Sequence, residues 1–546
     1  MRRLKGMMVG LLLAAVAGCA DQLVVENTND PDRLRVEGRP SEIEVLVASH
    51  YRVIHNTTLG TNESLLPQLM VMGMESYSSN ANFGMNVRGS YPRSGINNNR
   101  GNATATSVYS PFTELHQAAR AGALALSKLN DPNFIFSTGN AQKQRARAFA
   151  FFLIGVGLGN VALAYDSGTA IHSSDLTGAA DPALPFVAYD SLMRYALANL
   201  DSAIAIATGP VPTGTSWFPL PSTWISGQAL TAAQFAQLCN TYQARFRAGV
   251  ARTPTERLNV DWNAVIADAN AGITADFAIS MSNVTGGWFY RPAQMDLYQS
   301  WHQMWSFIVG MADTSGGYNA WLAVPHVDRL PFLILTNDLR FPSGTTRAAQ
   351  NTASGCGASS CLPPNANQFY RNRPGGVEVA VQGIAYSYYD FHRFQSYYNA
   401  NRGSATPFPL PFFPVAEMNL LRAEGQLRLG FTDPAITLIN VSRVLRGLPA
   451  IPLGSTTVPG TGCVPRVPTG PNGPTACGSI MEAMKWEKRM ETAYLSWGGW
   501  FFDGRGWGDL PQNTPLHYPV PYQELDARTQ PIYTITTGAA AGTYGL

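Results

Sequence analysis

Charged side chains are scarce in this sequence, and neither sign dominates. Only 14% of the 546 residues are Asp, Glu, Lys or Arg, with 38 basic residues against 36 acidic ones. Since no basic block is available to neutralise phosphate groups, nucleic acid is not an expected partner. Aromatic residues make up 11%, with many glycines and prolines. Such a composition favours neutral polar ligands over ionic ones.

The motifs of common catalytic sites are also missing. The sequence has no His-Glu-x-x-His, no Gly-x-Ser-x-Gly and no Walker loop. No Cys-x-x-Cys pair with a companion histidine points to a metal. We therefore expect no enzymatic activity, no cofactor and no metal ion.

The N-terminus has the pattern of an export signal. Three basic residues precede an apolar run, Met7–Ala17, which is shorter than the ~20 residues that an ordinary membrane span needs. The run ends in Ala-Val-Ala-Gly-Cys, with Cys19 last. We expect residues 1–18 to be removed and Cys19 to carry the lipid that anchors the chain, with 19–40 as a tether. The alternative is an ordinary secretory signal that contains a cysteine.

The other five cysteines fit an oxidising compartment. Cys356 and Cys361 flank a short loop, and Cys463 and Cys477 bracket a loop rich in proline and glycine. We predict two local disulfides from these spacings. Cys239 lies in an apolar helical pattern and is predicted to be a buried thiol.

Helical periodicity covers most of the chain outside a long irregular middle, 280–410. Ser41 is expected to cap the first helix and Asp433 a late one. A last helix is expected from Ser479 to about Trp497, followed by a turn. The helices predicted between these ends are Pro111–Leu129, Gln142–Tyr165, Pro185–Ile206, Thr231–Gly249, Trp262–Asp276, Pro414–Leu429 and Pro434–Arg446.

One helix is apolar enough to raise the question of a membrane span. Ala148–Ala164 contains Asn160 as its only strongly polar residue. Its three glycines, Gly155, Gly157 and Gly159, and its amphipathic flanks favour a buried helix in close contact with its neighbours. A nucleotide-binding loop is the weaker interpretation, because the glycines do not follow a strand.

Two glutamates, Glu417 and Glu424, lie two turns apart on one predicted helix, about 10 Å in helical rise. This pair would serve an inverting glycosidase. We favour structural carboxylates that pair with neighbours such as Arg422 or Arg428.

Four segments, taken in order, resemble the SusD/RagB family of outer-membrane nutrient-binding lipoproteins. The first is the Cys19 motif followed by Asn27-Thr-Asn-Asp-Pro. The second is Tyr109–Leu129 followed by Gln144-Arg-Ala-Arg-Ala-Phe-Ala-Phe-Phe. Together they match the start of the family pattern.

The later two segments are more specific. Val415-Ala-Glu-Met-Asn-Leu-Leu-Arg-Ala-Glu-Gly runs through to Asn440-Val-Ser-Arg-Val-Leu-Arg-Gly-Leu-Pro. Trp486-Glu-Lys-Arg-Met-Glu is followed by Phe502-Asp-Gly-Arg and then Pro519–Glu524. Glycine follows Asp503 where the family has leucine, which leaves that local detail open.

The resemblance implies a mainly α fold of TPR-like helical hairpins, with a long loop-rich half and few short strands. It implies 41–250 as an N-terminal region, interlocked with a C-terminal region, 251–546. Members act without catalysis at the outer membrane, where they capture oligosaccharides or peptides for a SusC-like TonB-dependent transporter. The open alternatives are a peptide-binding member, a surface glycoside hydrolase and a purely structural scaffold.

The ligand face in the family is built from loops, here about 75–105 and 285–325. Aromatic rings cover the apolar face of a sugar while amides bind its hydroxyl groups. The side chains that combine this placement with this chemistry are Tyr77, Asn80, Asn82, Tyr91, Trp288, Tyr290, Trp301 and Trp321.

Overall fold

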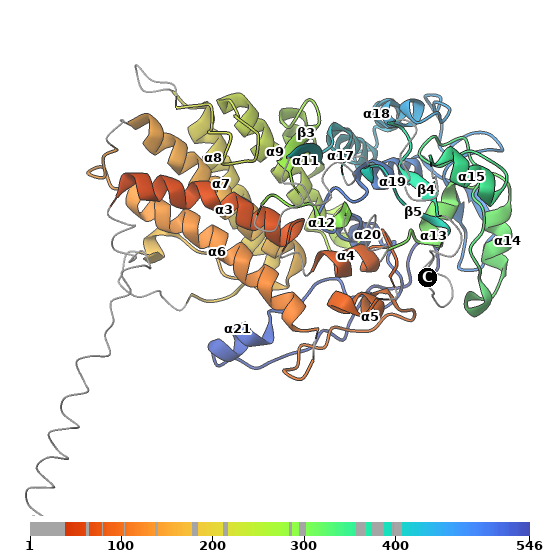
Figure 1. Ribbon diagram of the computed structural model, residues 1–546, viewed down its shortest axis with the longest axis horizontal. Coiled ribbons are helices and arrows are strands. Elements are labelled where there is room, and N and C mark those ends of the chain that lie inside the picture. Colours follow the sequence, from red (N-terminus) through yellow and green to blue (C-terminus); the bar gives the residue numbers. More distant parts are fainter. Residues whose placement is uncertain are drawn as a thin grey trace, which may run out of the picture.

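The computed structural model describes residues 39–61, 65–78, 80–102, 104–136, 140–176, 184–210, 217–282, 287–293, 302–355, 366–373, 387–395, 397 and 407–546. Long helices fill one end of an elongated body, and shorter helices, loops and small strands fill the other (Figure 1). The mainly α architecture predicted from the sequence is confirmed. Cys19 and most of the predicted tether lie outside the described residues. The tether ends earlier than predicted, because Pro40 already belongs to a helix.

Four long helices form the N-terminal end of the body. They are α3 (Pro40–Thr58), α6 (Thr106–Leu129), α7 (Asn140–Ala164) and α8 (Tyr189–Thr208). In the most apolar 18-residue stretch of α7, 89% is buried, because α3, α6 and α8 all pack against this helix. The apolar composition of this helix therefore matches its place in the protein core, as predicted.

The glycines of α7 allow this close packing. A Cβ atom on Gly155 would lie 2.6 Å from the Leu200 side chain, and one on Gly157 would lie 2.8 Å from the carbonyl oxygen of Leu115. Gly159 faces the ring of Phe246 in the same way. The prediction of close helix contact is confirmed.

A second helical layer joins this end to the rest. It contains α9 (Ala232–Gly249), α10 (Pro254–Leu258) and α11 (Trp262–Ala271), which pack beside the hairpin of α17 (Val415–Arg428) and α18 (Thr432–Leu445). Thr231 and Gln234 form a capping box at the start of α9. Cys239 in α9 is a buried free thiol, as predicted.

The C-terminal elements α19 (Ile480–Thr492), α20 (Gly499–Trp507) and α21 (Tyr522–Ala527) follow the hairpin. The side chain of Ser479 caps α19, accepting from the backbone N–H of Glu482 at 3.3 Å. The turn predicted after this helix is wrong, because the Gly/Trp/Phe-rich segment forms the buried helix α20. Gly498 and Gly508 bound it in the left-handed conformation.

Two predicted caps are also wrong. Ser41 lies inside α3, which begins at Pro40 without a side-chain cap. Proline at the first helical position has no N–H to satisfy, so the helix begins there. Asp433 lies inside α18, and its Oδ1 accepts from the backbone N–H of Gly454 at 2.7 Å instead.

The irregular middle contains short strands, as expected, and also short helices, which were not predicted there. Further short strands and helices lie elsewhere in the chain. The strands form antiparallel pairs: β1 (Ser167–Gly168) with β2 (Val187–Ala188), β3 (Phe277–Met281) with β6 (Phe408–Phe413), β4 (Tyr370–Asn372) with β5 (Tyr389–Phe391), and β7 (Arg466–Pro468) with β8 (Thr475–Cys477). The short helices are α4 (Leu66–Met72), η1 (Asn82–Gly84), α5 (Met85–Gly89), η2 (Ser173–Leu176), α12 (Arg291–Ala293), α13 (Ser306–Val309), η4 (Gly310–Ala312), α14 (Gly317–Ala323), η5 (His326–Asp328) and α15 (Arg347–Ala353).

Replacing Gly157 by alanine tests the close packing of α7. The added methyl group would meet the backbone oxygen of Leu115, which no side-chain rotation relieves. We expect Gly157→Ala to lower the free energy of unfolding by about 1–3 kcal/mol in a urea titration. Gly101→Ala is the matched control, since nothing lies within 4 Å of its Cβ position. Equal stability of both variants would contradict the packing argument.

Candidate functional site

Backbone pairing brings together the two stretches expected to bind ligand. The N–H of Tyr77 donates to the carbonyl of Gln303 at 2.7 Å, and the N–H of Gln303 donates back at 3.0 Å. The Gln303 side chain in turn donates to the carbonyl of Ser387 at 2.6 Å. The segments after α4 and before α13 therefore lie side by side, although 226 residues separate the paired positions in the chain.

Two buried arginines shape the first of these segments. Arg88 donates to the carbonyls of Ser94 and Gly95 at 3.1 and 3.0 Å. Arg93 donates to the carbonyls of Arg88 and Val71, and its guanidinium lies over the Trp305 ring. Burial lowers the pKa of Arg93 to about 9, and the nearby Arg88 adds to the shift. Arg93 is still protonated at neutral pH and keeps its donors.

An exposed tyrosine and a histidine meet at the tip of this segment. The rings of Tyr91 and His326 lie 5.4 Å apart at 60°. Tyr91 is 41% exposed and Val327 is 84% exposed. We call Asn80, Asn82, Tyr91, His326 and Val327 the loop face.

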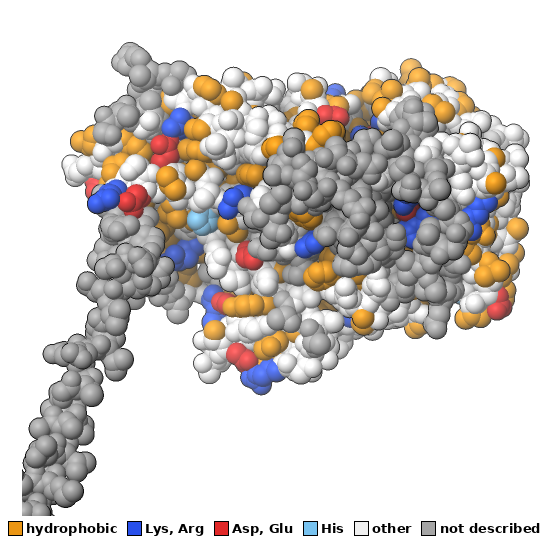
Figure 2. Space-filling model, viewed as in Figure 1, with side chains coloured by type: hydrophobic (Ala, Val, Ile, Leu, Met, Phe, Trp, Pro, Cys, Tyr) orange, Lys and Arg blue, Asp and Glu red, His pale blue; other side chains and the backbone are white. Residues whose placement is uncertain are grey.

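The loop face is close to electrically neutral. Burial lowers the pKa of His326 and the neighbouring Arg329 lowers it further, so that its imidazole is uncharged at neutral pH. On the side of the molecule drawn in Figure 2, charged side chains form small, scattered patches of both signs among larger apolar and white areas. Aromatic rings and amides on such a surface are able to contact a neutral polar ligand.

The other predicted aromatic residues lie elsewhere. Tyr290 is 2% exposed, and its hydroxyl donates to the carbonyl of Tyr494. Trp321 is 5% exposed and packs against both Tyr318 and Phe332. Neither ring offers a face to a ligand in this structure, because both belong to the core.

Two further predicted side chains are only partly covered. Trp288 packs against Tyr51 and His55 of α3, away from the loop face. Tyr77 is half-buried, with its ring beside Trp305. Trp301 lies outside the described residues. His326 was missed because it lies just beyond the stretch expected to bind ligand, and an isolated histidine gives no sequence signal.

A buried carboxyl group supports the base of the loop face. Glu75 lies two residues before Tyr77, and its Oε1 accepts from the backbone N–H of Tyr494 at 2.6 Å. Burial raises the pKa of Glu75 to about 8. The group is therefore a neutral carboxylic acid at neutral pH, and burying it costs far less than burying a carboxylate.

The two glutamates of α17 are structural. Arg245 donates to both oxygens of Glu417 at 2.7 and 2.6 Å, and Arg257 does the same to Glu424 at 2.9 and 2.6 Å. The prediction of structural carboxylates holds, but the main partners come from α9 and α10. Arg428 approaches Glu424 only at 3.5 Å.

The charge state of Glu424 also argues against catalysis. Burial alone would raise its pKa, but the Arg257 guanidinium outweighs burial and lowers that pKa to about 2. A fully ionised, buried carboxylate supplies no proton to a leaving group. Among the residues that the structure describes, no group of three His, Cys, Asp or Glu side chains is placed to hold a metal ion.

Comparison with solved structures decides the fold. A surface glycan-binding protein A from Bacteroides uniformis superposes with a TM-score of 0.53 at 14% identity, over 90% of this chain and 98% of that protein. The chain has the SusD-like fold. A SusD superfamily protein from Bacteroides thetaiotaomicron gives a TM-score of 0.50 at 12% identity, over 91% and 98% of the two chains. No family model and no curated protein matches the sequence.

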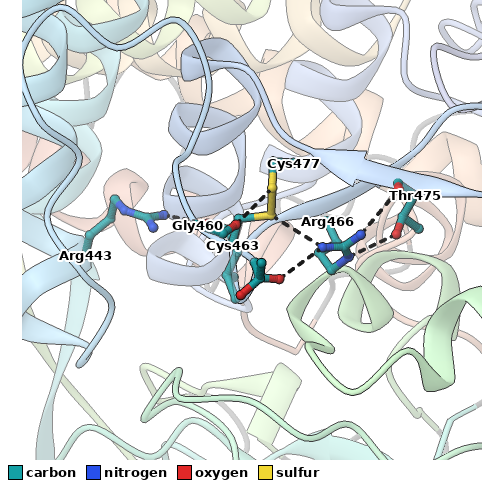
Figure 3. The surroundings of a disulfide bond; sticks show 8 residues. Arg443, Gly460, Cys463, Arg466, Thr475 and Cys477 are labelled. Atoms are coloured by element: carbon teal, nitrogen blue, oxygen red, sulfur yellow. Dashed lines mark hydrogen bonds between the residues drawn. A yellow bond between two sulfur atoms is a disulfide. The ribbon is translucent and has the colours of Figure 1, made fainter.

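Within this SusD-like fold, the two-stranded ribbon of β7 and β8, which a disulfide bond closes, supports the loop face. Cys463 and Cys477 form a disulfide with an S–S distance of 1.96 Å, as their spacing predicts (Figure 3). Arg466 of β7 donates to Oγ1 of Thr475 in β8 at 3.1 Å. The other predicted pair, Cys356 and Cys361, lies outside the described residues.

The ribbon contacts the segment that carries His326. The backbone N–H of Thr475 donates to Oδ1 of Asn319 in α14 at 2.9 Å. Arg329 donates from its guanidinium to the carbonyls of Pro471 and Leu322 at 3.0 and 2.8 Å. The disulfide-bonded ribbon thus braces the second half of the loop face.

Replacing Glu424 by glutamine tests its structural role in the SusD-like fold. We expect Glu424→Gln to lower the free energy of unfolding by about 3 kcal/mol at pH 7, because Arg257 loses its closest anion. Since the pKa of Glu424 is depressed on folding from 4.5 to about 2, its ion-pair stabilisation is present above pH 4.5 and disappears as the pH falls towards 2. Urea titrations over this range should show the difference between wild type and variant shrinking.

Asp190→Asn is the control for this experiment. Asp190 pairs with Arg194 on the exposed side of α8, and its loss should change stability by less than about 0.5 kcal/mol. A Glu424→Gln variant as stable as Asp190→Asn, or one that abolishes a hydrolytic activity while keeping full stability, would contradict the structural assignment.

Proposed function

We propose that this protein is a non-catalytic binding protein of the cell surface, which captures oligosaccharides and delivers them to a TonB-dependent outer-membrane transporter. The observation that carries the proposal is the loop face, where the exposed ring of Tyr91 packs against the partly buried, uncharged ring of His326. Asn80 and Asn82, on the same segment as Tyr91, supply amide groups. Sugars are neutral and have both apolar ring faces and hydroxyl groups, and this surface matches both features.

The fold supports the same function. The glycan-binding protein that superposes on this chain is described as a surface protein, and 98% of its length is covered. The hydrolase alternative named Glu417 and Glu424, and both are held in ion pairs with arginines. The low charge of the whole chain disfavours strongly charged peptides as ligands.

The loop-face prediction is tested by removing its exposed ring. Tyr91→Ala should weaken binding of a neutral oligosaccharide roughly tenfold in calorimetry, because stacking and burial of one aromatic face contribute about 1–2 kcal/mol. Phe431→Ala is the control, as Phe431 is an exposed aromatic residue at the start of α18, outside the loop face. Unchanged binding by Tyr91→Ala, or binding of peptides but no glycan, would overturn the glycan assignment.

The anchor is part of the proposal and is tested separately. Cys19 is proposed to hold the acyl chains on the outer membrane, with the body facing outside. Cys19→Ala should lose incorporation of a labelled fatty acid and leave the membrane fraction, whereas Cys239→Ala, which changes the buried thiol, should keep both. A wild-type protein with an unmodified, uncleaved N-terminus in mass spectrometry would contradict anchoring.

Delivery to a transporter predicts a stable partner. Pull-down of the wild-type protein from solubilised outer membranes should recover a large transporter of the TonB-dependent class. Recovery of the anchored protein alone, with glycan binding intact, would remove the delivery step and keep the capture step.

A further inference from the structure

A cavity of about 370 Å³ lies on a different part of the molecule from the loop face. Its floor is one side of α6, and its walls are the segment from Thr169 to Leu176, Leu184 and the helix α21. Small-molecule sites in proteins begin at about 300 Å³, so the cavity has the size of a ligand pocket. The glycan-capture proposal makes no use of it.

The floor of the cavity is aromatic and uncharged. The rings of Phe112 and His116 lie 4.3 Å apart. Nδ1 of His116 is 2.7 Å from the carbonyl of Phe112, and Nε2 accepts from the backbone N–H of Thr169 at 3.0 Å, which fixes the proton on Nδ1. Burial lowers the pKa of His116 to about 4, so the ring is neutral. Both ring nitrogens are engaged, and only the ring surface is left for a ligand.

Arg528 and Glu524 at the rim compensate each other's charge within the protein. Arg528 donates from Nε to Glu524 at 2.7 Å, from Nη2 to Oγ1 of Thr169 at 3.2 Å, and from Nη1 to the carbonyl of Leu184. Its guanidinium thereby ties α21 to two walls of the cavity. Arg120, which also lines the rim, is engaged by an interaction of its own. The Arg528–Glu524 pair therefore needs no charged group of a ligand to balance it.

Few neutral polar groups face the remaining apolar surface. Ile171, Leu176 and Leu184 are aliphatic, while Thr113 and Gln117 on α6 supply a hydroxyl and an amide. The Thr113 hydroxyl donates to the carbonyl of Tyr109 at 3.0 Å, which leaves its oxygen free to accept. A single hydroxyl group of a ligand is enough to form hydrogen bonds with both Thr113 and Gln117. A sugar would bring several more, and each one left unpaired against aliphatic walls would weaken binding about five- to a hundredfold.

We propose that this cavity binds a small, uncharged aromatic compound with a single hydroxyl group, independently of the loop face. The ring would lie on Phe112 and His116 between the aliphatic walls, and its hydroxyl would donate to Thr113 and accept from the amide of Gln117.

The full chain is titrated with 2-naphthol as the probe, followed by its fluorescence. We expect saturable binding at one site. Leu176→Trp fills the cavity from η2 and should weaken binding more than tenfold, while Gln117→Ala removes one hydrogen bond and should weaken it about two- to tenfold. Tyr91→Ala on the loop face should leave the affinity unchanged, which separates this site from glycan capture.

Several results would overturn the proposal. One is the absence of saturable 2-naphthol binding, and another is wild-type affinity in a Leu176→Trp variant that is shown to be folded by its cooperative unfolding. The others are tighter binding of the anionic 2-naphthoate than of 2-naphthol, and displacement of 2-naphthol by glucose. If Leu176→Trp fails to fold, the exposed Gln117→Ala variant decides the question, since unchanged affinity there would place the probe elsewhere.

Discussion

Buried ion pairs on α17 are the constraint on which the arrangement of the two ends depends. Arg257 and Glu424 are both fully buried, and Asp503 of α20 also contacts Arg257 at 3.0 Å. An unpaired charge at this depth would be strongly destabilising, so α10, α17 and α20 have to meet in one register. Arg245 and Glu417 add a second link from α9. Charge pairing thus specifies how the second helical layer sits against the hairpin of α17 and α18.

This framework leaves the loops to be shaped by backbone contacts. The segments that carry the two halves of the loop face are joined at Tyr77 and Gln303. Buried guanidinium groups, on Arg93 and Arg329, donate to carbonyl groups in the last turns of the short helices α4 and α14, where no further helical turn follows. Irregular segments are kept in place in this way, and their tips remain available for binding.

The sequence predicts most of the helices, because periodicity records which side of each helix is buried. The sequence predicts the ends of helices less well, because a capping side chain can bind a partner outside its own helix. Asp433, for example, accepts from the backbone N–H of Gly454. The partners of Glu417 and Glu424 lie more than 160 residues away, so neighbours such as Arg422 are poor guides. Aromatic composition also does not separate a core ring from a surface ring, which is why Tyr290 and Tyr91 seemed equivalent.

Glu75 gives the base of the loop face a dependence on proton concentration. Its carboxyl group has a pKa of 4.5 in an ordinary setting and about 8 in the folded protein. Folding therefore takes up a proton from the solvent between these two values, and stability from this group falls as the pH rises through them. Glu75 lies two residues before Tyr77 and accepts a hydrogen bond from the backbone N–H of Tyr494. An alkaline medium therefore weakens the protein at the base of the segment that carries Tyr91.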